Sequence, residues 1–128
     1  MAKIFYPELS YRITGVLYKT HNELGRYCSE KQYADSIENN FKKLKIDYER
    51  EMIIPIGFEG EFKGRNKVDF LVGGKIIIEI KAKKIITKED YFQTRRYLSI
   101  LNKKLAILVN FRSIYLSPKR ILNPNSNE

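Results

Sequence analysis

Three charged side chains lie in or near an isoleucine-rich segment, KIIIEIK, where a folded domain normally buries hydrocarbon. Asp69 precedes this segment, and Glu79 and Lys81 lie within it. At an effective dielectric constant near 20, two carboxylates roughly 5 Å apart repel by about 3 kcal/mol. An ordered carboxylate pair therefore implies a bound cation or a neighbouring ammonium group. Lys81 offers the ammonium group, and Mg²⁺ is a cation that prefers oxygen ligands.

These residue types suit metal-assisted hydrolysis of a phosphodiester. Asp69 and Glu79 would bind Mg²⁺ or Mn²⁺ together with the backbone carbonyl of Ile80, leaving water and a phosphate oxygen to complete the shell. Lys81 would orient or deprotonate the attacking water, or stabilise the charge that develops on the phosphate. Glu30 would hold a metal-bound water or help to recruit a second ion. The alternative is a solvated sheet edge with a surface salt bridge.

The charge balance favours a polyanionic partner. Lys and Arg outnumber Asp and Glu by 24 to 15, a net charge of +9. Phosphate contacts and counterion release make such a protein bind nucleic acid, although a positive surface also serves solubility alone. The basic residues that follow the isoleucine-rich segment would grip phosphates: Lys83, Lys84, Lys88, Arg95 and Arg96.

Two helices are expected in the first third of the chain. Apolar residues at helical spacing predict a helix over residues 7–25, with Gly25 as a left-handed C-terminal cap. Ser29 and Gln32 form a capping-box pattern for a second helix that runs to about residue 45. Its inward stripe would be Tyr33, Ile37, Phe41 and Leu44, with Glu30 at the near end or complementing the helix N-terminus at the surface.

Three strands are expected next, over residues 48–56, 67–72 and 75–81, and the third should be covered on both faces. A two-residue turn at Gly73-Gly74 would pair Asp69 with Ile78 and separate it from Glu79. A three-residue connection, Gly73-Gly74-Lys75, or a glycine bulge would instead set Asp69 opposite Glu79. A joint site at the open edge of this small sheet requires the second arrangement.

The second half predicts a β–α–β crossover. Thr87 is a candidate N-cap for a helix over residues 88–102, and an apolar strand over 105–111 should lie parallel to the strand 75–81. Residues 114–122 would add a short edge strand. We expect one domain over residues 1–122 and a flexible tail over 123–128.

Several classes of protein are disfavoured. The single cysteine, Cys28, excludes an intramolecular disulfide and a cysteine-rich metal site, and it fits a reducing compartment. No apolar run could cross a bilayer, and the start of the chain has no signal-peptide core, so we expect a cytoplasmic protein without membrane contact. His21 is the sole histidine and is expected to pack or lie at the surface.

The order of the charged residues resembles that of the PD-(D/E)XK nuclease superfamily, with an α–β–β–β–α–β core after an extra N-terminal helix. The chain to about Leu122 is similar to the small standalone GxxExxR branch through the segments YPELSYRITGVLYKTHNELG, EKQY, KVDFLV, IIIEIKAK, LAILVNF and KRILNP. This resemblance implies a restriction-endonuclease-like α/β fold, a mixed sheet flanked by helices and a metal-dependent nuclease. We expect its substrate to be DNA rather than RNA.

The chain also departs from that branch. Arg26-Tyr27-Cys28 fills a link that is more often Gly-rich with Pro-Gly, and Tyr33 stands three residues after Glu30, so the name-giving arginine has no clear counterpart. Farther on, Gln93-x-x-x-Tyr97 is similar to the Q-x-x-x-Y element of RecB-like nucleases, which would add both residues to the nucleic-acid contacts. A packed helix edge would produce the same spacing.

Two functions remain open at this point. One is a metal-dependent nuclease, and a symmetric homodimer with two active sites would suit so small a domain acting on branched DNA. The other is a non-catalytic nucleic-acid-binding or protein-interaction module that retains the fold. The intact Glu79-x-Lys81 favours the nuclease, because a purely binding protein has no evident need for it.

Overall fold

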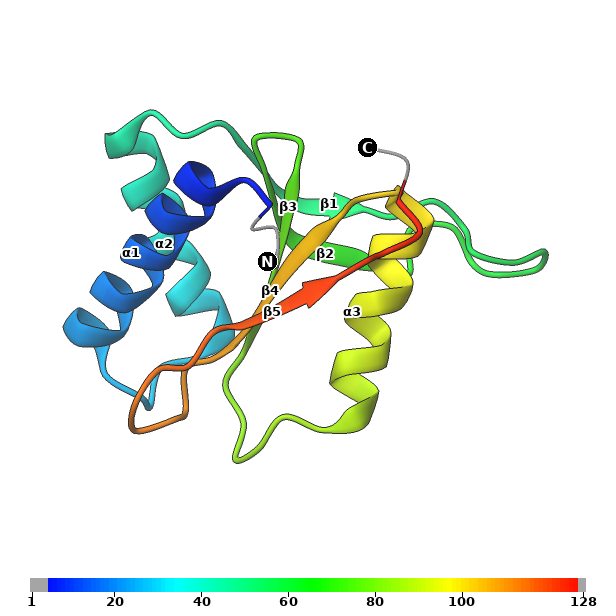
Figure 1. The fold of residues 1–128 in the computed structure, drawn as a ribbon. Coiled ribbons are helices and arrows are strands. Elements are labelled where there is room, and N and C mark those ends of the chain that lie inside the picture. The colour runs from blue at the N-terminus through cyan, green and yellow to red at the C-terminus, as the bar shows by residue number, and fades with distance from the viewer. Residues whose placement is uncertain (1–4, 127–128) are drawn as a thin grey trace.

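The protein, seen as a computed structural model that describes residues 5–126, is a three-layer arrangement of helices around one mixed sheet (Figure 1). Helices α1 and α2 cover one face of the sheet and α3 covers the other. The order of elements is the predicted one: α1 (Pro7–Leu24), α2 (Glu30–Leu44), β1 (Tyr48–Ile53), β2 (Lys67–Val72), β3 (Ile76–Lys81), α3 (Lys88–Leu101), β4 (Leu105–Asn110) and β5 (Lys119–Leu122).

Local hydrogen bonds explain where the helices begin. Ser29 and Gln32 form the predicted capping box of α2, and Lys45 ends that helix in a left-handed conformation. Thr87 caps α3 as predicted, and the Asp90 side chain completes a second capping box. Gly25 ends α1 at φ 74°, but its ψ of −156° lies outside the expected left-handed helical cap.

The sheet has the strand order β1-β2-β3-β4-β5. Strand β4 pairs in parallel with β3, as the predicted crossover through α3 requires, and the other neighbours are antiparallel. The isoleucine-rich β3 is therefore the central strand and is buried on both faces. The expectation of a site at a sheet edge is wrong in this respect, because β2 and β4 pair with β3 on its two sides.

The connection between β2 and β3 has three residues, as a joint site of Asp69 and Glu79 requires. Val72 pairs with Ile76 and Phe70 pairs with Ile78, so the turn comprises Gly73, Gly74 and Lys75. Both glycines have positive φ, 59° and 66°, which costs a residue with a Cβ atom about 1–2 kcal/mol. This register sets Asp69 level with Glu79.

The side-chain pattern of strand β2 shifts at Asp69. Phe70 and Val72 belong to the core under α1 and α2, whereas Leu71 and also Val68 belong to the core under α3. Regular alternation would put Val68 on the same face as Phe70, so the side-chain pattern shifts across Asp69. The facing residue of β1, Glu51, has a φ of 52° and interrupts the β1–β2 pairing. As a result, Asp69 is not part of the regular pairing between β1 and β2.

Some boundary predictions need correction. Leu44 is 48% exposed and does not join the inward stripe of α2, because it lies in the last turn of the helix, where the chain leaves the sheet. The strands expected over 48–56 and 114–122 shorten to the bounds of β1 and β5. Of the predicted tail, residues 127–128 lie outside the described part, and Asn123 donates to the carbonyl of Lys104.

Among residues 5–126, no helix is long and apolar enough to span a membrane.

Candidate active site

Glu79 is the most unusual side chain in the protein. It is 5% exposed on the central strand, and its Oε1 atom is buried without a hydrogen-bond partner among the described residues. Ile77, two residues earlier, packs toward α3, and alternation directs Glu79 to that side. Burial, followed by the charge of the adjacent Asp69, raises the pKa of Glu79 well above its ordinary value of 4.5.

Asp69 lies beside Glu79 because the register of β2 and β3 sets the two residues level. Its Oδ2 atom accepts a hydrogen bond of 2.6 Å from the backbone N–H of Ile80. Burial raises the Asp69 pKa, and the Glu30 charge adds to the rise, although the bond from Ile80 and the charge of Lys81 oppose it. Of the backbone groups of Ile80, the N–H is therefore the one that contacts this carboxylate.

Lys81 lies at the open end of β3, and its charge acts to lower the pKa of both Asp69 and Glu79. Its side chain is 20% exposed, and its Nζ atom lies 4.0 Å from the Oδ1 atom of Asp90 on α3. The other oxygen of Asp90 accepts a bond of 2.8 Å from Lys83 Nζ. Burial acts to raise the Asp90 pKa, but the bonds from Lys83 and Thr87 outweigh it and leave that pKa lowered.

Glu30 reaches the same region from the first turn of α2. It is exposed, and its Oε2 atom accepts a 3.2 Å bond from the backbone N–H of Ala82, next to Lys81. An open hollow of about 220 Å³ exposes part of this region, and it is lined by Glu30, Lys31, Ala34, Arg50, Glu51 and Asp69. Asp69 connects the predicted quartet, because the charges of Glu30 and Lys81 both act on its pKa and its side chain hydrogen-bonds with Glu79.

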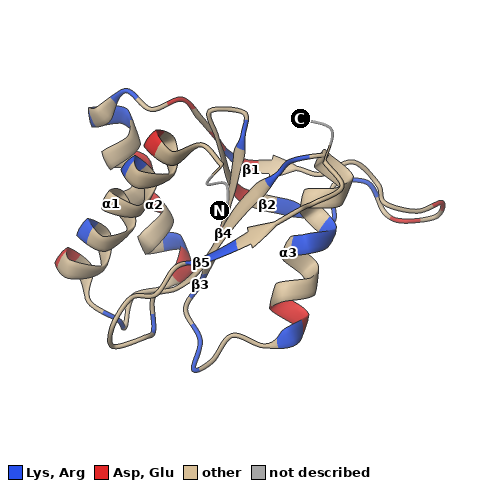
Figure 2. Ribbon diagram, in the orientation of Figure 1, with Lys and Arg blue, Asp and Glu red and all other residues tan. Residues whose placement is uncertain are grey.

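The predicted nucleic-acid contacts fall into two groups. Lys83 pairs with Asp90, Arg96 pairs with Glu61 at 3.2 Å, and Tyr97 is buried, with its pKa raised by burial and by the Glu79 charge. The remaining members are exposed: Lys84, Lys88, Gln93 and Arg95. Figure 2 shows Lys and Arg along the connection from β3 to α3 and on α3 itself. The exposed group is therefore free to meet phosphate.

Two polar residues at the site are absent from the sequence-based prediction. Asp90 lies beside both Lys81 and Lys83, and its position three residues after Thr87 is a capping-box pattern that could have identified it. Asn110 is buried, accepts a bond from the backbone N–H of Lys83 and donates one to its carbonyl. No sequence signal distinguishes this asparagine from one that simply ends a strand.

The donor set fits a divalent cation that keeps part of its shell as water and substrate. Among the described residues, no group of three or more acidic, histidine or cysteine side chains is placed to hold a metal. Two adjacent carboxylates are present, and one buried oxygen of Glu79 lacks a partner. Magnesium is typically bound by one or two carboxylates with waters and phosphate oxygens, so Asp69 and Glu79 suffice as side-chain ligands.

Comparison with known proteins agrees with this arrangement. The family model described as the PD-(D/E)XK nuclease superfamily matches residues 7–121. Neither a comparison with curated proteins nor one with solved structures found a match. The matched range contains all eight helices and strands except the last residue of β5, together with the four charged residues of the site. The chain belongs to the PD-(D/E)XK nuclease superfamily.

Proposed function

We propose that the protein is a metal-dependent nuclease that hydrolyses phosphodiester bonds in nucleic acid, with DNA as its substrate. The observation that carries the proposal is the buried Glu79 carboxylate, which has an unpartnered oxygen beside Asp69 and Lys81. Such a group costs about 1–3 kcal/mol or more in a purely structural role. A bound cation removes that cost.

Asp69 and Glu79 hold the Mg²⁺ or Mn²⁺ ion in this proposal, with the Ile80 carbonyl as a third protein ligand. When bound, the ion supplies positive charge near the scissile phosphate and makes a bound water more acidic. The Lys81 ammonium orients the attacking water and stabilises negative charge that develops on phosphate oxygens. Glu30 faces the hollow and holds a further water.

Asp90 serves as a positioning residue for Lys81. Its Oδ1 atom lies 4.0 Å from Lys81 Nζ, and its backbone position is secured by the α3 capping box. The buried Asp90 carboxylate thus restrains the free end of the lysine while Lys83 neutralises the second oxygen. An ammonium group held near its working position loses less conformational freedom when substrate binds.

Cleavage assays test the proposal. We expect purified protein to cut single-stranded, duplex or branched DNA with Mg²⁺ or Mn²⁺ and to lose activity in EDTA. Glu79→Gln and Lys81→Met should each lower the cleavage rate by about 100-fold or more. The matched controls Glu59→Gln and Lys43→Met change exposed side chains away from the site and should leave the rate near that of the unaltered protein.

Metal binding provides a second readout that does not depend on turnover. Mg²⁺ should raise the melting temperature of the unaltered protein but not that of Glu79→Gln, because a ligand that binds only the folded state stabilises it. Thermal stabilisation by metal without cleavage of any DNA or RNA would exclude a nuclease and support the binding-module alternative. Cleavage that survives Glu79→Gln would refute the assigned site.

A further inference from the structure

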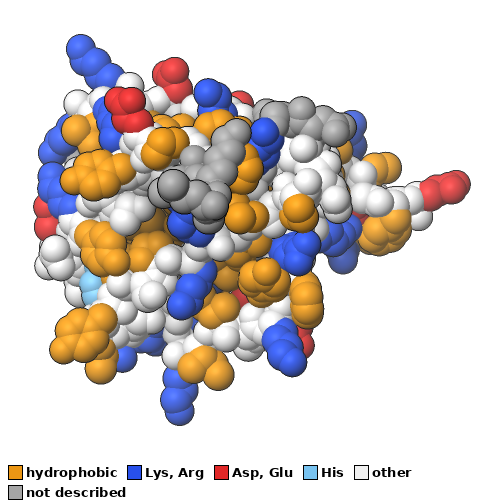
Figure 3. All heavy atoms as spheres, in the orientation of Figure 1, with side chains coloured by type: hydrophobic (Ala, Val, Ile, Leu, Met, Phe, Trp, Pro, Cys, Tyr) orange, Lys and Arg blue, Asp and Glu red, His pale blue; other side chains and the backbone are white. Residues whose placement is uncertain are grey.

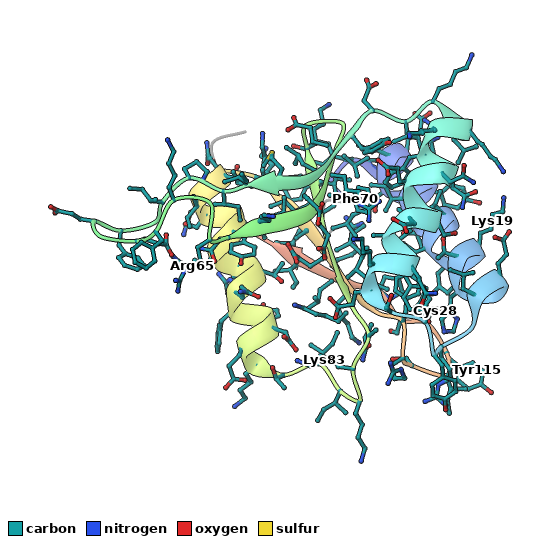
Figure 4. All side chains as sticks on the ribbon, turned by 180° about the vertical axis from the view of Figure 1, so that it is seen from behind. Lys19, Cys28, Arg65, Phe70, Lys83 and Tyr115 are labelled. Carbon is teal, nitrogen blue, oxygen red and sulfur yellow. The ribbon has the colours of Figure 1, made fainter. Side chains whose placement is uncertain are left out.

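Two arginines next to the candidate site hold one another in place. The Arg26 Nε atom donates to the carbonyl of Arg112, and the Arg112 Nε atom donates to the carbonyl of Arg26, each at 2.7 Å. Arg26 belongs to the connection between α1 and α2, and Arg112 follows β4. In Figure 4, Cys28 and Tyr115 from these two segments lie at the same corner of the molecule. The reciprocal bonds explain this close approach.

Tyr27 completes this group, which we call the arginine clasp: Arg26, Tyr27 and Arg112. Tyr27 is 76% exposed, and the guanidinium carbons of Arg26 and Arg112 lie over its ring, 5.0 and 5.5 Å from the ring centroid. Arg26 also donates from Nη1 to the Tyr27 hydroxyl at 3.1 Å. The clasp therefore presents an exposed tyrosine with two cations over its ring.

The positive charge of the clasp is not neutralised within the described part of the chain, where no carboxylate forms an ion pair with Arg26 or Arg112. A guanidinium carries five N–H donors, and the hydrogen bonds that each arginine makes leave Nη donors available. Two neighbouring cations repel one another, so an anion between them is electrostatically favoured. Phosphate matches guanidinium geometry particularly well.

Hydrogen bonds connect the clasp to the site. Asn110 Oδ1 accepts from the backbone N–H of Arg112 and from that of Lys83. The N–H of Phe111, one residue before Arg112, donates to the carbonyl of Lys81 at 2.9 Å. On the other side, Glu30 lies three residues after Tyr27 and bonds to Ala82. The clasp and the candidate catalytic residues therefore share one end of the sheet.

We propose that the arginine clasp binds an unpaired nucleotide of the strand that enters the site, with its phosphate on the guanidinium groups and its base stacked on Tyr27. The identity of the ligand rests on the proposed function, whereas the binding site rests on the geometry of the clasp. An exposed tyrosine beside arginines is a platform on which any base can stack. A paired base within a duplex is not available for such stacking. The clasp therefore favours single-stranded segments over continuous duplex.

The experiment measures the affinity of the full chain for fluorescent oligo-dT, oligo-U and a blunt duplex in EDTA, by anisotropy at several salt concentrations. Tyr27→Ala should weaken binding of the single strands by roughly five- to hundredfold and change duplex binding much less. Tyr27→Phe keeps the ring and should bind like the unaltered protein. Arg112→Gln should reduce the salt slope for the single strand by about 0.7.

Two control variants change comparable side chains elsewhere. Tyr11→Ala removes a tyrosine that is 81% exposed near the start of α1, and Lys43→Gln removes one charge near the end of α2. Neither control variant should change the affinity for single strands by more than about twofold, since each removes at most one phosphate contact far from the clasp. Melting temperatures of all variants show whether a loss of binding reflects a loss of folding.

The outcomes separate this proposal from the nuclease assignment. Single-strand binding that depends on Tyr27, without cleavage in any metal, supports the clasp and contradicts the nuclease. Metal-dependent cleavage with unchanged binding by Tyr27→Ala and Arg112→Gln overturns the clasp and leaves the nuclease in place. A lower melting temperature with unchanged affinity and salt slope would show that these residues only fasten two loops together.

Discussion

At the scale of single residues, Glu79 destabilises the folded protein by its burial and is also the main candidate for a metal ligand. Its carboxylate is buried beside Asp69, and its Oε1 atom has no partner within residues 5–126. A hydrophobic residue would suit the α3-facing core better, since burial of a carboxylate with an unsatisfied oxygen beside a second carboxylate is destabilising. A site that holds a cation explains why the charge occupies this position.

The pKa of Glu79 makes stability depend on pH. Burial and the Asp69 charge raise this pKa in the folded state above the ordinary value of 4.5, which the unfolded chain retains. The folded protein binds the proton more tightly, so this contribution to stability is complete below about pH 4.5 and is lost as pH rises toward the raised pKa.

Glu79→Gln should remove that loss, because its neutral amide has no charge to bury. In EDTA near neutral pH, we expect this variant to be more stable than the unaltered protein by about 1–3 kcal/mol. The difference should shrink toward about pH 4.5, and urea denaturation at a series of pH values measures it. The exposed control Glu59→Gln should show no comparable gain, and equal stability of Glu79→Gln at every pH would contradict the burial argument.

At the scale of elements, the connection between β2 and β3 decides whether the site exists. Three residues, Gly73, Gly74 and Lys75, set Asp69 level with Glu79, whereas a two-residue turn would have paired Asp69 with Ile78. The capping boxes of α2 and α3 then fix the ends that carry Glu30 and Asp90. Short local motifs at strand and helix ends thus position side chains from four separate elements.

Glycine substitutions test the turn. Gly73→Ala should destabilise the protein by about 1–2 kcal/mol, because φ is 59° and a Cβ atom would lie 3.0 Å from a Leu9 methyl carbon. Gly15→Ala is the matched control inside α1, where a Cβ atom meets nothing within 4 Å, and it should stabilise the helix by about 0.5–1 kcal/mol. Urea denaturation compares the two, and equal effects of the same sign would refute this account of the turn.

The sequence predicted the elements and the site to different degrees. The bounds of β2, the caps Ser29 and Thr87, and the parallel pairing of β3 with β4 are confirmed, because periodicity and capping are local signals. Leu44 was wrongly expected to be buried, since a helical stripe does not show where the helix passes beyond its sheet. The proximity of Asp90 to Lys81 depends on α3 docking and was not foreseen.

At the scale of the whole molecule, charge is distributed so that part of it is neutralised internally and part faces solvent. The space-filling view in Figure 3 shows many Lys and Arg side chains, fewer Asp and Glu side chains and exposed hydrophobic groups between them. Arg50, Lys83 and Arg96 pair with carboxylates, whereas Lys84 and Lys88 are exposed after β3. The net charge of +9 alone does not identify which cations meet phosphate.

Removal of Lys84 and Lys88 tests that distinction. The double variant Lys84→Gln/Lys88→Gln should weaken nucleic-acid binding and reduce the slope of affinity against salt by about 1.4–1.8, the value for two lost phosphate contacts. Removal of equal charge at Lys42 and Lys43, near the far end of α2, should change the slope much less. Anisotropy titrations in EDTA measure both slopes, and equal reductions would indicate that only net charge matters.

The sequence by itself determined the order of helices and strands, a strand covered on both faces with its internal carboxylate, and the resemblance to a nuclease family. These features depend on hydrophobic periodicity, capping residues and spacing along the chain, which act over a few residues. Only the tertiary structure decided the turn register, the shift of the side-chain pattern at Asp69, the proximity of Asp90 to Lys81 and the meeting of Arg26 with Arg112. Each of those features involves residues from separate elements, so its geometry depends on how the strands pair and the helices dock.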